Sequence, residues 1–382
     1  MRRNHAPLLC LVVLAVLAVP SIAAARTIHV TPGDSIQAAV DDARRGDTVA
    51  VAPGTYTEAG TPCPSEPGHT CAVVITENRI RLVGRPSENR PVVLQDAGGQ
   101  DEGISVGKTA DPACLDDPDM RVEGSFVSGF TVNGFDDDGV FLYCVDDWRV
   151  TKVTATDNLE YGIFPSHSGP GRIDHSFVSG SNDTGFYIGQ SHDARMDHNF
   201  ATDNVSGYEI ENSARIRADH NEATGNTGGI LSFTLPFLDV KSNSENVIVH
   251  NSVHGNNRPN TCLDPDDAVC GVPQGTGILL LAADDNRVFA NDVTGNDTFG
   301  IAVANFCLGT GTPPEICELL DIQPDSDGNR VVSNTVTGNG GNPDPDVVPV
   351  FAVDLAWDGT GTGNCWSNNV FGTSFPPPLP EC

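Results

Sequence analysis

The chain repeats one short pattern of polar residues about every 22 positions. A clear copy is HNFATDNVSGYEIENS, residues 198–213, and the next is HNEATGNTGGILSFTL, residues 220–235. Each copy begins with His-Asn, places a second Asn five positions later and passes through Gly into a segment of alternating side chains. A unit of this length cannot bury a core by itself, so the copies must stack on one another.

The asparagines of the pattern recur through most of the chain. The first Asn of the unit occurs at Asn199, Asn221, Asn251, Asn291 and Asn334, and the second at Asn158, Asn182, Asn204, Asn226, Asn256, Asn296 and Asn339. Each unit contains three short β-type segments, which are separated by Asn, Gly and Asp. The pattern predicts coils whose strands form parallel sheets, ~4.8 Å apart, with stacked Asn side chains hydrogen-bonded to each other.

These repeats resemble those of the right-handed parallel β-helix proteins, the superfamily of pectate lyases, polygalacturonases and alginate epimerases. The resemblance covers roughly residues 27–372 and includes SIQAAVDDARRGDTVAVAPGTYTE, residues 35–58, which is similar to the usual N-terminal entry of the group. Residues 147–235 are most similar to uncharacterised or maturation-factor-type repeat proteins. The resemblance implies an all-β solenoid of about ten coils with an N-terminal helical cap.

The N-terminus has the pattern of a secretory signal peptide. Arg2 and Arg3 precede an apolar run, and three alanines at 23–25 form a small-residue cleavage site. We therefore assign residues 1–25 to the signal, 26–75 to the cap and first strands, 76–375 to the coils, and 376–382 to a tail held by a disulfide. The protein is expected to be exported, to the periplasm or the outside of the cell.

Ten cysteines follow Cys10, which lies in the predicted signal. Because an exported protein with an even number of cysteines favours disulfides, and most of these cysteines are close in sequence, we predict five local bridges. The pairs are Cys63–Cys71, Cys262–Cys270, Cys307–Cys317 and Cys365–Cys382, with Cys114–Cys144 remaining by elimination.

The formal net charge of −30 restricts the partners. Such a chain repels nucleic acid and anionic membrane surfaces, and it could attract cations. After the signal, no apolar run is long enough to cross a bilayer. Regularly spaced apolar residues argue against disorder.

Alternation after the repeated Gly separates an inward from an outward row of side chains. Val140, Leu142, Ile163, Phe186 and Tyr208 belong to the inward row. The outward row contains Phe141, Tyr143, Phe164, Tyr187, Glu209 and Glu211, and His167, Gln190 and Asn212 follow one position later. Loops at 108–120, 234–245 and 306–328 could wall a groove along the outward row, or they could fold over it.

Aromatic rings stack on sugars, while amides and carboxylates bind sugar hydroxyls. Glu209 and Glu211 could form an acid–base pair for glycoside hydrolysis. For lyase or epimerase chemistry, Tyr187, His167 or His192 could be the base that removes a sugar C5 proton, with Ca²⁺ neutralising the sugar carboxylate. Substrate would contact Phe141, Tyr143, Phe164, Gln190 and Asn212. The carboxylates could instead bind Ca²⁺, or form a solvated acidic patch, so the metal requirement stays open.

The chain departs from the enzymes that it resembles. It lacks the Asp-Pro-His-Asp motif of alginate epimerases, and no Arg lies on the outward row where a pectate lyase would use one. Asp137, Glu160 and Asp183 form an acidic column, but their pattern differs from the three Asp residues of polygalacturonases. No activity can therefore be transferred residue by residue.

The sequence predicts a protein that recognises a polysaccharide, with cleavage or epimerisation as the chemistry its outward row would support. One alternative is a non-catalytic binding or adhesion scaffold. Another is an accessory factor for metalloenzyme maturation, which would bind a transition metal at the column His175, His198, His220 and His250. These alternatives leave open whether the protein is an enzyme.

Overall fold

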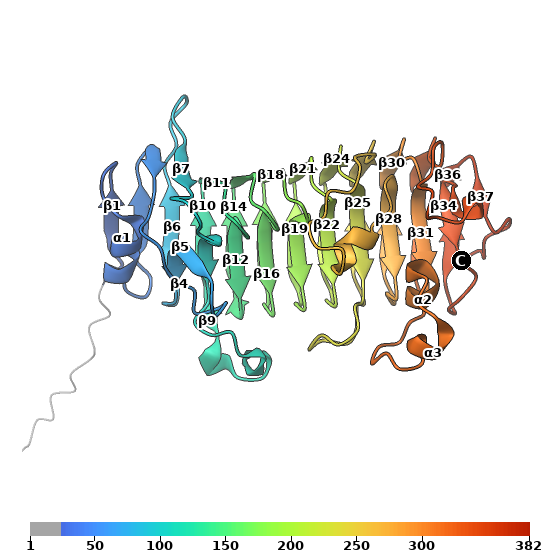
Figure 1. Ribbon diagram of the computed structural model, residues 1–382, viewed down its shortest axis with the longest axis horizontal. Coiled ribbons are helices and arrows are strands. Elements are labelled where there is room, and N and C mark those ends of the chain that lie inside the picture. The colour runs from blue at the N-terminus through green and yellow to red at the C-terminus, as the bar shows by residue number, and fades with distance from the viewer. Residues whose placement is uncertain (1–23) are drawn as a thin grey trace, which may run out of the picture.

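The computed structural model describes residues 24–382, so most of the predicted signal peptide lies outside the described residues. Three long sheets run the length of the molecule (Figure 1). The first has 12 strands, from β1 (Thr27–Val30) to β35 (Cys365–Ser367). The second has 11, from β3 (Gly54–Tyr56) to β36 (Val370–Phe371), and the third has 12, from β4 (Thr61–Pro62) to β37 (Ser374–Phe375).

One coil of the solenoid contributes one strand to each sheet. β20 (Ala194–Asp197), β21 (Phe200–Thr202) and β22 (Ser206–Glu211) form such a coil. Successive coils pair in parallel register, with Arg195 opposite Arg217. The predicted all-β parallel solenoid with three β segments per repeat is confirmed, with slightly more strands per sheet than the ten coils expected.

The inward row forms one continuous core inside the coils. Val140, Ile163, Phe186 and Tyr208 are fully buried, and the rings of Phe186 and Tyr208 stack with centroids 5.0 Å apart. The helix α1 (Ile36–Asp42) lies at the N-terminal end of the solenoid (Figure 1) and adds two buried residues to this core. Its N-cap is a serine hydroxyl that accepts a hydrogen bond from the first turn.

The asparagine ladders form as predicted, with one exception. Asn204 donates through Nδ2 to Asn226 at 3.0 Å, and Asn226 donates to Asn256 at 3.0 Å. The position expected for Asn182 is taken by Ser181, whose backbone N–H donates to Asn204 Oδ1. A third ladder, which was not predicted from the repeat, joins Asn246, Asn286, Asn329 and Asn364.

All five predicted disulfides are present. Cys365–Cys382 ties the C-terminal tail to the last strand of the first sheet. Bridges of this number are typical of proteins that fold in an oxidising compartment. Across residues 24–382, no helix has the length and apolar character that a membrane span requires.

The outer face of the first sheet pairs stacked arginines with buried aspartates. Asp174, which is 1% exposed, accepts hydrogen bonds from Arg149 and from His175 Nδ1 at 2.7 Å each. The imidazoles of His175 and His198 stack with centroids 5.1 Å apart, and each donates a hydrogen bond through Nδ1 to the carboxylate of the residue that precedes it. The outer face of the first sheet is therefore a salt-bridged face, and its stacked imidazoles add hydrogen bonds to the buried aspartates.

Replacing Asp174 with asparagine should remove part of the acid sensitivity of the fold. Burial alone would raise the pKa of Asp174, but the hydrogen bonds from Arg149 and His175 lower it to about 2, from 3.8. A lowered pKa stabilises the folded state above pH 3.8 and loses that contribution as the pH falls toward 2. Urea unfolding should show Asp174→Asn about 2 kcal/mol less stable at pH 7 and equal to wild type near pH 2. A constant difference across this range would contradict the assignment.

Candidate functional site

The outer face of the third sheet gathers carboxyl groups and aromatic rings in one band. Its strands here are β8 (Glu102–Val106), β12 (Val140–Tyr143), β16 (Ile163–Ser166), β19 (Thr184–Gly189) and β22. The register places Tyr187 opposite Glu209 and Phe141 opposite Phe164. We call this band the acidic–aromatic strip, and it consists of Glu102, Asp137, Asp138, Phe141, Glu160, Tyr161, Phe164, Asp183, Tyr187, Glu209 and Glu211.

Three rings pack together at the centre of the strip. Phe164 and Tyr187 are stacked, with centroids 4.4 Å apart and ring planes 6° from parallel. The Tyr161 ring lies 4.7 Å from Phe164 and 5.0 Å from Tyr187. Tyr161 and Phe164 are half-buried, whereas Tyr187 is 7% exposed. The cluster therefore offers Tyr161 and Phe164 to a ligand and supports them with Tyr187.

Sequence alternation missed Tyr161 because the repeated Gly interrupts it. A Cβ atom added to Gly185 would lie 2.9 Å from Nδ2 of the buried Asn204, so this position faces the core. The next residue, Phe186, also faces the core. The Gly and the residue after it therefore both face the core. As a result, the residue before each Gly and the second residue after each Gly face outward. The only sequence signal for these positions was the neighbouring acidic column of Asp137, Glu160 and Asp183.

Glu209 and Glu211 lie at the C-terminal end of the strip. Their exposed fractions are 4% and 5%. Burial raises the pKa of Glu209 to about 7 and that of Glu211 to about 8. The Tyr187 hydroxyl donates a hydrogen bond to Glu211 Oε2, so the structure brings together these three predicted residues. Carboxyl groups with pKa values near neutrality can both donate and accept protons at physiological pH.

The opposite end of the strip carries a second group of carboxyls. Burial, followed by the charge of Asp137, raises the pKa of Glu102 to about 10. Burial and the charge of Glu160 raise the pKa of Asp137 to about 8. Burial also raises the pKa of Asp138. Both ends of the strip are therefore places where negative charge is poorly solvated.

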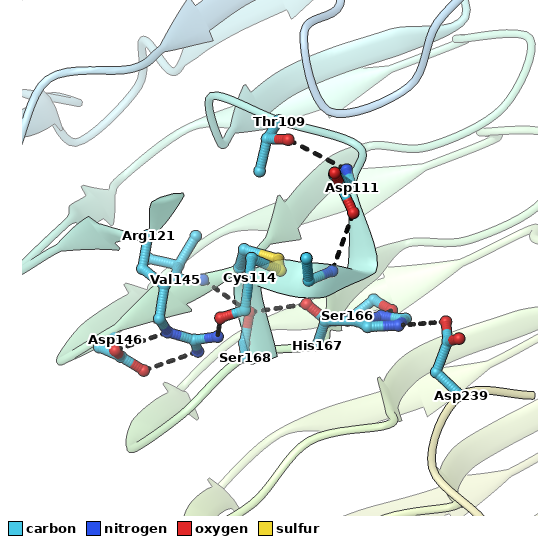
Figure 2. Close-up of a disulfide and its surroundings, with 12 residues drawn as sticks. Thr109, Asp111, Cys114, Arg121, Val145, Asp146, Ser166, His167, Ser168 and Asp239 are labelled. Carbon is cyan, nitrogen blue, oxygen red and sulfur yellow. Dashed lines mark hydrogen bonds and ion pairs between the residues drawn. A yellow bond between two sulfur atoms is a disulfide. The ribbon is translucent and has the colours of Figure 1, made fainter. Parts of the chain in front are cut away.

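The remaining predicted residues hold a loop in place. His167 is 4% exposed, and its ring nitrogens contact the Ser166 hydroxyl at 2.8 Å and Asp239 at 3.1 Å (Figure 2). Gln190 Oε1 accepts hydrogen bonds from the backbone of residues 239 and 240. Asn212 exchanges hydrogen bonds with Leu235. These polar atoms fasten the loop at 234–245 to the third sheet. Tyr143, whose ring centroid lies 4.6 Å from that of His167, borders the same contact.

The loops expected to wall a groove leave the same edge of the third sheet (Figure 1). One contains η1 (Pro112–Leu115) and η2 (Pro118–Met120) and is fixed by Cys114–Cys144 (Figure 2). A further segment with η3 (Ala268–Gly271) packs Val269 and Val272 against Leu231 and Phe233. It covers the outward row beyond Glu211, so the strip ends there.

A model of the right-handed β-helix region matches residues 138–307, which include the whole central part of the strip. The chain folds as a right-handed parallel β-helix. No curated protein sequence matches it.

Several solved structures share this β-helix. The A-module of the mannuronan C-5 epimerase AlgE4 from Azotobacter vinelandii superposes with a TM-score of 0.60 at 16% identity, covering 89% of this chain and 93% of that one. The periplasmic alginate epimerase AlgG gives 0.58 at 15%, covering 91% and 73%. DFA-IIIase from Arthrobacter chlorophenolicus A6 gives 0.54 at 14%, covering 90% and 87%. At these identities the likeness establishes the fold alone.

Proposed function

We propose that this β-helix protein is exported and acts on a polysaccharide bound along the acidic–aromatic strip. The observation that carries the proposal is a half-buried aromatic cluster flanked on one sheet face by carboxyls with raised pKa values. Sugar rings stack on aromatic faces, and carboxyls bind and protonate sugar oxygens. Structures of two alginate epimerases with the same fold support a carbohydrate-related role. The five disulfides and the predicted signal peptide support export.

The charge of the strip favours a neutral polymer over an acidic one. Every ionisable group of the strip other than its tyrosine hydroxyls is a carboxyl, and the whole chain carries a net charge of −30. A polyuronate would meet repulsion unless a cation lay between polymer and protein. Removal of a proton beside a sugar carboxylate needs that cation as well. Hydrolysis of a neutral glycosidic bond needs only a proton donor and a second carboxylate.

Glu209 and Glu211 fit those two roles. They point the same way from one strand, so their Cβ atoms are ~7 Å apart. Glu211, with the higher pKa, is mostly protonated at neutral pH and can donate to a glycosidic oxygen. Glu209, with a pKa of about 7, is partly ionised and can act as the base or nucleophile. Tyr187 orients Glu211 through its hydroxyl.

A second candidate is binding without catalysis. The low exposure of Glu209 and Glu211 favours it, because a substrate must reach both carboxyls to react. Tyr161 and Phe164, which are more accessible, would then provide the contacts with sugar. The two functions share a surface and differ only in whether a product forms.

The test is a panel of neutral and acidic polysaccharides incubated with the disulfide-intact protein. New reducing ends, unsaturated-product absorbance and retardation in affinity electrophoresis would be followed for each. We expect new reducing ends that fall by at least about 100-fold in Glu209→Gln/Glu211→Gln. The exposed Glu222→Gln, on the second sheet, is the matched control. Retardation without product, lost in Tyr161→Ala/Phe164→Ala, would establish binding alone. If no polysaccharide gave a product and none was retarded, both functions would be refuted.

A further inference from the structure

Four side chains converge beside the N-terminal end of the strip. They are Glu66, His69, Glu102 and Asp137, and one ligand atom of each lies within 4.8 Å of the others. His69 Nδ1 is 3.1 Å from Asp137 Oδ2, 3.3 Å from Glu102 Oε1 and 4.0 Å from Glu66 Oε1. One imidazole nitrogen therefore faces three carboxylates in a space of single-ion size.

Three separate segments bring these groups together. Glu102 begins β8, and Asp137 lies just before β12 on the next coil. Glu66 and His69 come from the hairpin of β4 and β5 (Thr70–Ile75), whose ends are joined by the disulfide Cys63–Cys71. Inside this loop the His69 carbonyl accepts from the Cys63 N–H at 3.1 Å, and the His69 N–H donates to the Glu66 carbonyl at 3.2 Å. The hairpin thus holds its two side chains against the sheet in a fixed arrangement.

The buried carboxylates of this end have atoms without partners. Glu102 is 0% exposed, and within the described residues its Oε2 has no hydrogen-bond partner. Asp138, on the adjacent coil and 2% exposed, likewise has an unpartnered Oδ1 in the described part of the chain. Buried carboxylate oxygens are normally hydrogen-bonded, paired with a cation or bound to a metal. The unused Glu102 oxygen is therefore an observation independent of the clustering.

The negative charge around these four side chains also favours the binding of a cation. Glu66, Glu102 and Asp137 place three carboxyl groups against the single imidazole of His69. Without a bound cation, these charges can be relieved only by protonation or by His69. A divalent ion would neutralise two of them at once.

We propose that Glu66, His69, Glu102 and Asp137 bind one divalent transition metal ion, with Zn²⁺ and Mn²⁺ as the matching ions. An imidazole nitrogen together with carboxylate oxygens is a donor set of these ions, whereas Ca²⁺ is bound by oxygens alone. The bound ion links the loop between β4 and β5 to β8 and to the residues just before β12, at the N-terminal end of the strip. Glu102 and Asp137 also belong to the acidic–aromatic strip, but ion binding by the four side chains can be measured without any polysaccharide.

The experiment uses the disulfide-intact protein, freed of metal by a chelator and dialysed. Titration calorimetry with Zn²⁺, Mn²⁺ and Ca²⁺ is combined with thermal unfolding. We expect one equivalent of Zn²⁺ or Mn²⁺ to bind more tightly than Ca²⁺ and to raise Tm, because an ion that binds only the folded state stabilises it. His69→Ala and Glu102→Gln should each weaken binding by at least about 10- to 100-fold.

The matched control is His254→Ala. Its imidazole lies 3.3 Å from the exposed Glu222 on the second sheet, so it removes an equivalent His–carboxylate pair elsewhere. Circular dichroism would verify that each variant is folded, and His69→Gln is the milder substitute should His69→Ala unfold. Absence of saturable Zn²⁺ and Mn²⁺ binding, affinities unchanged in both site variants, or a preference for Ca²⁺ would overturn the proposal. Polysaccharide activity that persists after any of these results would leave the proposed function standing.

Discussion

Replacing Glu211 with glutamine should remove a loss of stability that the wild-type protein suffers as the pH rises. The pKa of Glu211 is raised by burial from 4.5 to about 8 in the folded state. The folded protein therefore holds the proton more tightly than the unfolded chain does. The resulting stability is fully present below pH 4.5 and is lost progressively as the pH rises to about 8. A shift of this size corresponds to about 5 kcal/mol.

Urea unfolding at pH 5, 7 and 8.5 would measure this effect. Glutamine keeps the size of the side chain and cannot ionise, so Glu211→Gln should be more stable than wild type at pH 8.5 and close to it at pH 5. Glu209, with a pKa raised to about 7, faces the same region and adds to the slope, as do Glu102 and Asp137. The difference between variant and wild type is therefore the quantity of interest, with Glu222→Gln as control. Parallel pH profiles for wild type and Glu211→Gln would show that the carboxyl is not buried in solution.

The fold was predictable because its information is local and repeated. A coil returns to its starting corner after about 22 residues, so the spacing of Asn204 and Asn226 in the sequence predicts that they are in contact. Inward residues such as Val140 and Phe186 follow from alternation within single strands. The disulfides could also be predicted from the sequence, because most pairs close short loops within one segment.

The candidate site was only partly predictable because its contacts depend on excursions from the repeat. Tyr187, Glu209 and Glu211 follow strand alternation, and the structure places them together. Gln190 and Asn212 lie in the column one position later, and their amides bind a loop whose path the repeat does not encode. His69 reaches Glu102 from a hairpin 33 residues away in sequence, and no periodic signal links the two.

Replacing Asn226 with alanine should cause a large loss of stability, because this side chain serves three successive coils. Its Oδ1 accepts hydrogen bonds from Asn204 N at 3.1 Å and Asn204 Nδ2 at 3.0 Å. Its Nδ2 donates to Ala201 O at 3.1 Å and Asn256 Oδ1 at 3.0 Å. Asn204, Asn226 and Asn256 are all 0% exposed, so water cannot replace the lost partner.

Alanine would leave the backbone N–H and the side-chain amide of Asn204 without the acceptor that they share, and it would remove one donor to the Ala201 carbonyl, at an expected cost of about 3–5 kcal/mol. The measurement is the midpoint and slope of urea unfolding, compared with Asn342→Ala, which truncates an exposed asparagine of the same chain. Because each coil contacts only its neighbours, the loss should also appear as faster amide hydrogen exchange at 199–211 and 221–233, while β1 and β35 keep their protection. A loss below about 1 kcal/mol, equal to that of the exposed control, would show that the ladder contributes corner geometry and little free energy.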